Sequence, residues 1–310
     1  SASFNIGFNK NRVEKFKNGE SNYKTYSSKW NGNSAAPFDD YIIREGEAVG
    51  QMYGYITGGM YTFDDFDYIG TGTYPYRLKG DTDGSKTEAA ASLIGAKYFG
   101  PGSLKLVDKD GNIATSTDAK TVIGNANPDL IGGFNLTARY KGFDLSAFFN
   151  FSIGNDVYNA NKIDNSCYSG SRKYNNLVEE MKNRFTYIDP ATGYLAYNDP
   201  VRLAEINKNA TIWSPYMTTA VLHSWAVEDG SFLRFNNLTL GYTFPKRWVK
   251  KLGLTNLRIY GTVYNVCVIT GYSGFDPEVS TRNSTAMTPG VDYSAYPKSR
   301  SFIGGVNVSF

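Results

Sequence analysis

The feature that most constrains this chain is a pair of long alternating runs between Gly133 and Ile153. In each run apolar residues alternate with mostly polar ones, which is the two-residue period of a β-strand. Only Lys141 and Gly142 separate the runs, as in a tight hairpin. A tilted strand needs roughly 9 to 11 residues to cross a bilayer, whereas ordinary strands average about five or six. Because both runs are this long, the hairpin predicts a membrane-spanning wall with one apolar face, formed by Phe134, Leu136, Ala138, Tyr140, Phe143, Leu145, Ala147, Phe149, Phe151 and Ile153.

Composition is consistent with a transmembrane barrel. The chain has 310 residues and a mean hydropathy of −0.39, and no apolar run approaches the roughly eighteen residues of a spanning helix. A barrel has low average hydropathy because its lumenal faces and long loops are polar. Aromatic residues make up 15% of the chain, which fits interfacial girdles. Since the net charge is only +3 and there is no Lys/Arg run, we expect no nucleic-acid partner.

Five further segments alternate in the same way. They lie at residues 1 to 9, 49 to 57, 231 to 244, 257 to 264 and 302 to 310. In the segment from 231 to 244, Leu233 and Phe235 are out of phase with Leu238 and the residues that follow. One extra residue in a strand produces such a change of phase, so we predict a β-bulge at Asn236 and Asn237.

Long segments without strand periodicity separate these runs. We expect connections at 10 to 45, 61 to 127, 154 to 229 and 270 to 299, with a further strand around Tyr23 to Trp30 and a helix over 176 to 185. Short turns are expected at Lys141 and Gly142 and at 245 to 256. Long extracellular loops and short periplasmic turns are typical of outer-membrane barrels. With about seven strands, this rule places Phe310 at the periplasmic side and Ser1 at the outer surface.

The start of the chain predicts a fragment. Ser1 lies within a strand pattern and no signal peptide precedes it, although barrel proteins are exported. We therefore expect a piece of a longer protein. The two cysteines, Cys167 and Cys267, form neither a disulfide framework nor a metal site by their spacing, although they could pair with each other.

Several segments resemble one family in its own order. These are IGNANPDLIGGFNLTARYKGFDLSAFFNFSIGNDVYN (123 to 159), EDGSFLRFNNLTLGYTFP (228 to 245), LRIYGTVYN (257 to 265), GYSGFDPEVS (271 to 280) and GVDYSAYPKSRSFIGGVNVSF (290 to 310). They are similar to the C-terminal barrel of SusC/RagA-type TonB-linked outer membrane proteins. Residues 1 to 16 and 49 to 61 also resemble it, and Phe310 is similar to the terminal aromatic of outer-membrane barrels.

The resemblance implies an all-β fold: residues 1 to 310 would be the C-terminal part of a plugged transmembrane barrel of about 22 strands. The plug, the TonB box and the earlier strands would lie outside this chain. The implied protein is a multi-pass importer of the Bacteroidota outer membrane, in contact with outer membrane lipids. Its implied partners are a SusD-like lipoprotein lid and the TonB–ExbB–ExbD complex, and SusC–SusD pairs could form a dimer.

The implied function is TonB-dependent import of an oligosaccharide or, as an alternative, of a peptide. No enzymatic activity, cofactor or metal is expected. Loop aromatics could stack on substrate or pack the loops together, and lumen-facing residues could line the path or contact the plug. The loop candidates are Tyr61, Phe63, Trp213, Tyr216 and Trp225; the lumen-facing candidates are Arg139, Asp144, Asn150, Arg258 and Tyr264.

Other readings of the residues are weaker. His223 is the only histidine, which excludes a histidine-based triad or zinc site within the chain. Asp64 and Asp65 are adjacent acids in a loop, where solvated carboxylates are commoner than glycosidase pairs. The segment 107 to 118, VDKDGNIATSTD, lacks the full spacing of a calcium loop. Two other classes remain as alternatives: a soluble β-sandwich module that binds glycans, and a barrel that acts only as adhesin or receptor.

Overall fold

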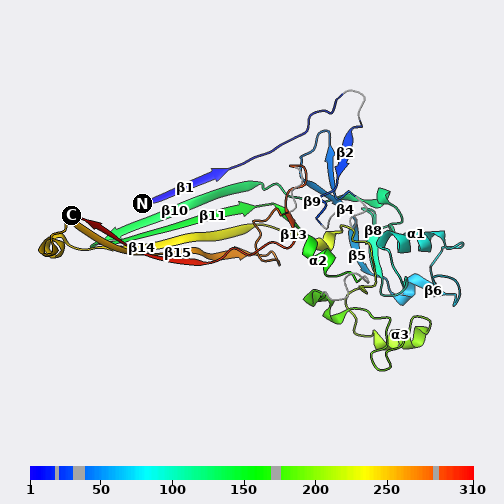
Figure 1. Cartoon of the computed structure of the whole chain (residues 1–310). Helices are drawn as coiled ribbons and strands as arrows, with labels where there is room; N and C mark the ends of the chain where they lie inside the picture. Colours follow the sequence, from blue (N-terminus) through cyan, green and yellow to red (C-terminus); the bar gives the residue numbers. More distant parts are fainter. Residues whose placement is uncertain (18–20, 31–38, 169–175, 282–285) are drawn as a thin grey trace.

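The computed structural model describes residues 1–17, 21–30, 39–168, 176–281 and 286–310. Parts of the connections expected at 10 to 45, 154 to 229 and 270 to 299 therefore lie outside the described residues. The chain forms an elongated antiparallel sheet, the wall sheet, and a compact loop domain at one end of it (Figure 1). The loop domain comprises the described residues of the three long connections, which span 8–129, 154–231 and 271–300.

The wall sheet contains six strands in the order β1-β10-β11-β14-β15-β17. Every neighbouring pair is antiparallel. The expected hairpin is confirmed, with its turn at Lys141 and Gly142, both of which have positive φ. The strands are β1 (Ala2–Gly7), β10 (Leu130–Tyr140), β11 (Phe143–Ile153), β14 (Phe232–Thr243), β15 (Asn256–Thr270) and β17 (Ser301–Ser309).

The two faces of the wall sheet differ as the alternation predicts. One face carries cross-strand aromatic stacks: Phe149 stacks on Phe134 at 4.5 Å and on Phe235 at 4.3 Å between ring centroids. Many of its aliphatic residues are exposed, and Leu240 retains 52% of its accessible surface. A soluble sandwich would need short strands and a polar outer face. Strands of 11 to 15 residues with an exposed apolar face argue against that alternative.

The bulge predicted in β14 is confirmed at Asn236. Phe235 pairs with Phe149 and Asn237 with Phe148, so Asn236 is the extra residue. The shift continues into β15, where the partners change from Cys267 to Tyr264. The insertion restores the phase of the strand, which keeps the apolar side chains of both halves on one face.

The position of Ser1 differs from the expectation. The Ser1 ammonium donates to the carbonyl of Thr137 at 2.8 Å, close to the β10–β11 turn. Phe310 lies beside Thr255 at the other short connection, so both termini lie at the end of the sheet away from the loop domain (Figure 1). The prediction of Ser1 at the outer surface is wrong because it counted the strand around 49 to 57 in the wall. Six strands, not seven, place both termini at one end.

Residues 49 to 60 do form strands, but in the loop domain. Strands β4 (Gln51–Gly54) and β5 (Ile56–Met60) lie in two separate small sheets. Strand β4 pairs with β9 (Thr121–Asn125), and β5 pairs with β8 (Leu104–Val107). The strand expected near Tyr23 is present. The other strands of the domain are β2 (Tyr23–Tyr26), β3 (Tyr41–Arg44), β6 (Phe66–Tyr68), β7 (Tyr76–Leu78), β8 (Leu104–Val107), β9 (Thr121–Asn125), β12 (Asp156–Asn159), β13 (Val227–Asp229) and β16 (Val291–Asp292).

The loop domain also contains short helices. They are α1 (Ser85–Ile94), α2 (Ala160–Asp164) and α3 (Pro200–Ile206), with α4 (Lys246–Val249) in the short connection between β14 and β15. Single 3-10 turns are η1 (Phe63–Asp65), η2 (Thr117–Ala119), η5 (Ser224–Ala226) and η6 (Lys250–Leu252). Among the described residues no helix has the length and apolar character needed to cross a membrane.

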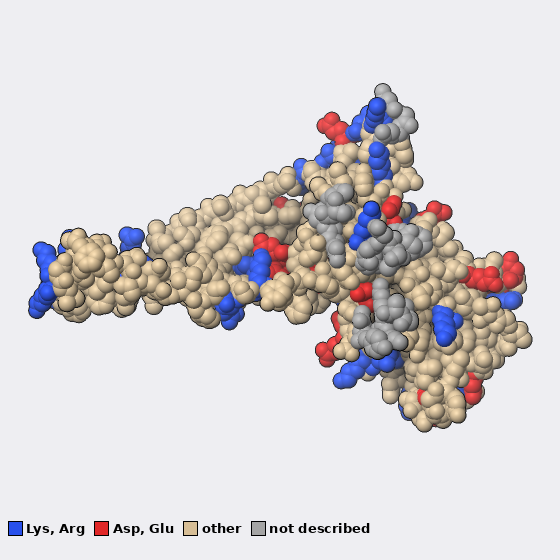
Figure 2. Space-filling model, viewed as in Figure 1, with Lys and Arg blue, Asp and Glu red and all other residues tan. Residues whose placement is uncertain are grey.

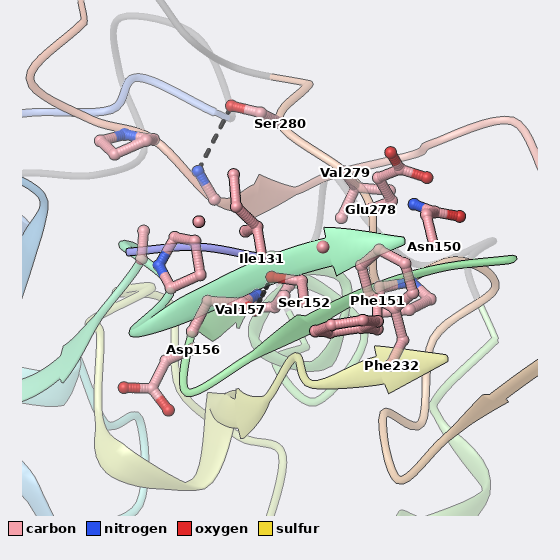
Figure 3. Close-up of a pocket in the computed structure, with 18 of the residues that line it drawn as sticks. Ile131, Asn150, Phe151, Ser152, Asp156, Val157, Phe232, Glu278, Val279 and Ser280 are labelled. Carbon is pink, nitrogen blue, oxygen red and sulfur yellow. Dashed lines mark hydrogen bonds between the residues drawn. The ribbon is translucent and has the colours of Figure 1, made fainter. Parts of the chain in front are cut away.

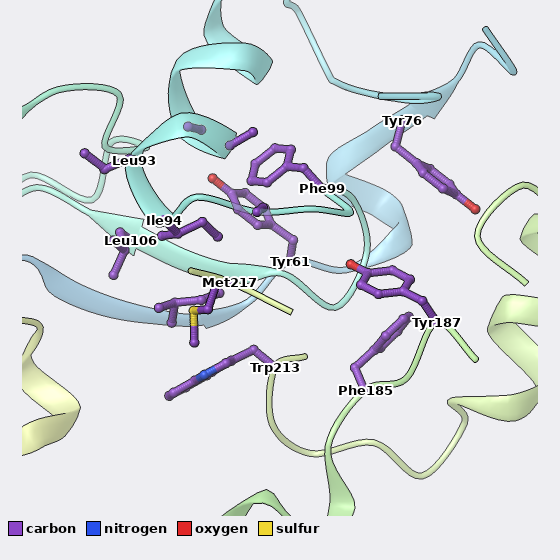
Figure 4. Packing of buried hydrophobic residues seen from close by; sticks show 14 of the residues in the cluster. Tyr61, Tyr76, Leu93, Ile94, Phe99, Leu106, Phe185, Tyr187, Trp213 and Met217 are labelled. Atoms are coloured by element: carbon purple, nitrogen blue, oxygen red, sulfur yellow. The ribbon is translucent and has the colours of Figure 1, made fainter. Parts of the chain in front are cut away.

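The segment from 61 to 127 was expected to be loop-like, and this is wrong. It supplies much of an aromatic core, in which the ring centroids of Tyr61 and Phe99 lie 5.4 Å apart and those of Phe185 and Tyr187 also lie 5.4 Å apart (Figure 4). The core draws its residues from 55–114 and 167–221. No single stretch of the sequence has a periodic pattern of these core residues. Neither strand alternation nor helical periodicity therefore predicted the core.

The helix expected over 176 to 185 is shorter than predicted. Only Glu179–Asn183, named η4, is helical, and it is a 3-10 segment. Met181 and Phe185 of the expected apolar stripe are buried in the aromatic core, and Leu177 packs against it. The stripe was therefore identified correctly, whereas the extended backbone at Val178 and Arg184 ends the helix on both sides.

Candidate functional site

The polar face of the wall sheet carries two adjoining pockets where it meets the loop domain. The rim pocket, of about 830 Å³, lies between the ends of β1, β10 and β11 and the segment 277–280 (Figure 3). The wall pocket, of about 880 Å³, lies further along β14 and β15 under residues 296–299. Asn150 and Glu278 line both pockets, so we treat the two as one candidate site.

The wall pocket combines amides with aromatic rings. Its amide side chains hydrogen-bond to each other, since Asn236 Nδ2 donates to Asn150 Oδ1. Its aromatic residues are exposed, with Tyr264 at 45% and Tyr296 at 88% of their accessible surface. Amides donate and accept, and ring faces pack on apolar surfaces, so the lining suits an uncharged polar ligand. The residues involved are Phe148, Asn150, Asn236, Asn237, Tyr264, Asn265 and Tyr296.

A buried charge network holds the covering loop over this pocket. Arg234 of β14 is 2% exposed and donates to Asp276 Oδ1 at 2.5 Å. It also donates to Asn265 Oδ1 at 2.8 Å. Lys298 pairs with Glu278 at 2.5 Å on the same loop. Because charge-assisted bonds from a planar guanidinium fix geometry, the network sets the position of the loop segments at 276–278 and 298–299.

Asn265 contributes a second constraint. It has φ of +52°, in the left-handed region that asparagine tolerates better than most residues. This conformation accompanies the change of register opposite Asn236. Its Nδ2 donates to the carbonyl of Lys298 at 2.9 Å, so the strand irregularity and the covering loop are joined by one side chain.

The lumen-facing candidates separate into two groups. Asn150 and Tyr264 line the wall pocket. Arg139, Asp144 and Arg258 instead surround a pocket of about 470 Å³ next to the Lys141 turn, at the far end of the sheet. There Arg258 donates two hydrogen bonds to the Asp144 carboxylate, of 3.0 and 2.5 Å. All five share the polar face, as predicted, but only the first two lie near the loop domain.

The five loop aromatics lie together in the core of the loop domain. Tyr61 is 2% and Trp213 4% exposed, while Phe63, Tyr216 and Trp225 pack against the same cluster. The sequence left two roles open for these rings, stacking on substrate or packing the loops together, and the structure shows them packed. Rings at such depth stabilise the loop domain, and Tyr61 and Trp213 are too deeply buried to contact a substrate.

His223 is buried in the loop domain beside two tryptophan rings. It stacks on Trp225 at 5.9 Å and meets Trp213 edge-on at 5.6 Å. Its Nδ1 lies 2.8 Å from Thr57 Oγ1. Burial, reinforced by the positive charge of Lys162, lowers the pKa of His223 to about 3. The imidazole is therefore neutral at physiological pH, and its contacts are packing contacts within the loop domain.

Two further groups in the loop domain have shifted pKa values. Asp40 is buried, and burial raises its pKa to about 6 although Ser28 donates two hydrogen bonds to it. Burial also lowers the pKa of Lys120 to about 8. Neither group lines the rim pocket or the wall pocket, so these shifts bear on stability rather than on ligand binding.

The remaining motif candidates fall outside the site. In the segment 107 to 118, Asp108 accepts hydrogen bonds from Asp110 and Asn112, which is an ordinary polar turn. The described residues contain no group of three or more histidine, cysteine, aspartate or glutamate side chains placed to hold a metal. Asp65 binds Lys105 at 2.8 Å. Cys167 is buried, whereas Cys267 is exposed on the apolar face, so they do not form a disulfide with each other.

Sequence reasoning missed several residues of the site. Phe148 and Asn237 lie on the polar face by alternation, and the predicted bulge marks Asn236. These could have been found from the strand pattern. Glu278, Tyr296 and Lys298 come from a segment without periodicity, and no local signal places them over the sheet.

Comparisons with known proteins agree with this architecture. No family model matches the chain. It is 31% identical over its whole length to TonB-dependent receptor P3 of Formosa agariphila, of which it covers 26%. It is 27% identical to TonB-dependent receptor P39 of the same organism over 99% of the chain, covering 28% of that relative. It is 28% identical to TonB-dependent receptor SusC of Bacteroides thetaiotaomicron over 66% of the chain, covering 17% of SusC.

The fold agrees with solved structures. The RagAB peptide importer in its open-open state matches the whole chain with a TM-score of 0.65 at 20% identity, and the chain covers 26% of the matched chain. The closed-closed state matches with a TM-score of 0.63 at 21% identity, with 27% covered. The wall sheet is accordingly part of a β-barrel wall. The relatives are receptors and transporters, in agreement with a non-enzymatic protein.

The chain spans about a quarter of the length of the curated relatives it matches along its whole length. Six antiparallel strands with one apolar and one polar face, the long loops at one end and these similarities lead to one assignment. The chain is SusC-like: it is similar over its whole length to part of TonB-dependent receptors, and over 66% of its length to SusC.

Proposed function

We propose that this chain is the C-terminal part of the barrel of an outer-membrane transporter that imports an oligosaccharide in a TonB-dependent manner. The observation that carries the proposal is the wall pocket, which lies on the polar face and joins four asparagine side chains to exposed rings. Sugars present hydroxyl groups, which match amides, and apolar ring faces, which match aromatic side chains. The charged side chains at this pocket, Glu278 and Lys298, neutralise each other.

The proposed mechanism assigns a role to each part of the described chain. The apolar face of the wall sheet contacts outer membrane lipids, and the polar face lines the lumen. Asn150 and Tyr264 contact substrate as it passes the rim, while the Arg234 network keeps the covering loop in place. A SusD-like lipoprotein would close over the loop domain, and pairs of such complexes would form a dimer. TonB with ExbB and ExbD would supply the energy through a plug outside this chain.

A peptide is the second candidate substrate. The observation that favours it is the fold similarity to the RagAB peptide importer. Amides also bind peptide backbones, since they offer a donor and an acceptor in the same plane. The wall pocket fits either substrate by its chemistry, and uptake measurements separate them.

The test is uptake by cells that carry the whole receptor. Growth on a panel of oligosaccharides and peptides as sole carbon source should show one oligosaccharide that requires both the receptor and TonB. Replacing Asn150 and Tyr264 by alanine should slow its uptake about tenfold, since two hydrogen-bonding contacts are lost. Asn307→Ala, on the polar face of β17 far from the pocket, is the matched control. Growth that is unaffected by loss of TonB would contradict the proposal.

A further inference from the structure

A second polar pocket, of about 500 Å³, lies within the loop domain, away from the polar face of the wall sheet. We name it the loop pocket. It is bounded by α2, the 3-10 segment η4, residues 273–275 and the end of β16. The residues that matter for its chemistry are Asn159, Lys162, Glu179, Glu180, Phe275 and Asp292.

Asp292 supplies an acceptor atom that has no partner among the described residues. It lies on β16, paired in parallel with Asn159 of β12, and is 2% exposed. Its Oδ2 accepts a hydrogen bond from the Tyr272 hydroxyl at 2.6 Å. Burial and the neighbouring carboxylate raise the pKa of Tyr272, so this hydroxyl remains a donor. Asp292 Oδ1 is buried and has no hydrogen-bond partner among the described residues, an arrangement that costs free energy until a donor arrives.

The charges around the pocket favour a cation. Glu179 and Glu180 are exposed and lie on its lining, and neither takes part in an ion pair within the described part of the chain. The ammonium group of Lys162 is already engaged, because Glu228 lies 3.4 Å from it and the Trp225 ring centroid 4.3 Å from it. Within the described part of the chain, three carboxylates at this pocket therefore have no cationic partner, which concentrates negative potential there.

Phe275 completes the lining with an aromatic surface. It is 77% exposed although it is a large apolar residue. An exposed ring beside carboxylates is the combination that binds ammonium groups, since the ring face attracts a cation and the carboxylates accept its N–H bonds. A neutral sugar would use the ring but would gain nothing from the excess negative charge.

We propose that the loop pocket binds a primary ammonium group of a ligand. The ammonium donates to Asp292 Oδ1, Glu179 and Glu180 attract it, and Phe275 packs against it. This inference goes beyond the proposed function because it concerns a different pocket and needs no transport. An amino sugar and a peptide with lysine side chains both present this group.

The test is binding by the purified whole receptor in detergent, measured by calorimetry. The probes are a β-1,4-linked glucosamine trimer and its fully N-acetylated form, and trilysine and its fully N-acetylated form. We expect one or both free amines to bind, with affinity falling as salt is raised, and the acetylated probes to bind at least about tenfold more weakly. The free amine that binds with the higher affinity identifies whether the ammonium group comes from an amino sugar or from a peptide. Equal binding of free and acetylated probes, or no binding of either amine, would overturn the proposal.

Variants locate the binding. The double variant Glu179→Gln and Glu180→Gln changes exposed residues, so it should fold; it should weaken binding severalfold and flatten the salt dependence. Asp292→Asn should weaken binding further. Glu88→Gln, at an exposed position on α1, removes one charge elsewhere and should leave the affinity unchanged. An unchanged affinity in the double variant would contradict the site even if Asp292→Asn failed to fold. Because no uptake is measured, failed import would leave this result intact.

Discussion

The wall sheet and the loop domain place their aromatic residues in opposite ways. In the wall sheet, Phe134, Phe149 and Phe235 stack across strands and are half-buried, on a face where Leu240 and Phe302 are exposed. In the loop domain, Tyr61, Phe99 and Tyr187 are fully or almost fully buried in one cluster. The difference fits the proposed function, in which the wall faces lipid with its apolar surface, whereas the loop domain hides its apolar surface from water.

The charged residues follow the same division. In Figure 2 the side of the wall sheet that is in view is largely without charge, and basic residues gather at its far end. The short connection there carries Lys246, Arg247, Lys250 and Lys251. The pairs on the polar face, such as Asp144 with Arg258, neutralise each other. The following predictions test whether the two parts are stabilised independently.

The largest effect is expected in the core of the loop domain. Phe99 is fully buried and contacts Tyr61, Phe66 and Tyr74. Phe99→Ala should destabilise this domain by about 3 to 5 kcal/mol because it leaves a cavity. Limited proteolysis across a temperature series, with fragments identified by mass, should show earlier cleavage of the loop domain.

The matched control for that experiment is Phe302→Ala. Phe302 is 75% exposed on the apolar face of β17, so its loss leaves no cavity within the chain. The temperature at which the loop domain is cleaved should stay unchanged. If the two variants shifted it equally, the separation of the two parts would be refuted.

The next effect concerns the faces of the wall sheet. Leu240 lies on the apolar face, whereas its neighbour Thr239 lies on the polar face and contacts Thr262 at 2.8 Å. Leu240→Arg should cost about 2 to 4 kcal/mol if the residue faces the middle of the bilayer. The readout is the fraction of receptor that changes mobility between heated and unheated gel samples. Thr239→Arg, with the same new side chain, should assemble nearly normally, and equal defects would show the face assignment to be mistaken.

A smaller effect is expected from pH, and only in the loop domain. The pKa of His223 falls from its ordinary 6.5 to about 3 in the folded protein, so folding favours the neutral ring. Its stabilisation is complete above pH 6.5 and is lost as the pH falls toward 3, by about 1.4 kcal/mol per unit. The melting temperature of the loop domain should therefore drop between pH 7 and pH 5.5.

Asp40 acts in the opposite direction in part of this range. Its folded pKa is raised to about 6, so the cost of its buried charge is relieved as the pH falls from 6 toward 4. The His223 contribution is thus the difference between the wild-type receptor and His223→Asn at each pH. If both proteins followed the same pH profile, His223 would not be the titrating group.

The smallest effect is expected at Gly241. A Cβ there would lie 2.4 Å from Arg258 Nη2 and 2.7 Å from Asp144 Oδ1, so Gly241→Ala should push this ion pair apart. The pair is partly exposed and its side chains can move, so the cost should be about 1 kcal/mol or less. Thermal unfolding of the barrel measures it. Repeating the change in an Asp144→Asn background should give a smaller cost, and an equal cost would mean that the glycine acts through the backbone alone.

Much of the wall was predictable from the sequence. Alternation placed Arg139, Asp144, Asn150, Arg258 and Tyr264 on one face, because side-chain direction in a strand has a strict period of two. The bulge at Asn236 appeared as a break in that period. The loop domain was not predictable in this way, since its core joins residues such as Tyr61 and Trp213 that are far apart in the chain.

The sequence by itself determined the hairpin, the two faces, the bulge and the family, because each depends on local order along the chain. Only the tertiary structure decided which strands form the wall, where Ser1 lies, and that Lys298 and Glu278 cover the pocket beside Asn150. These features depend on how segments separated by long connections meet. Such contacts depend on burial and strand pairing over the whole molecule, so the local periodicity of the sequence does not predict them.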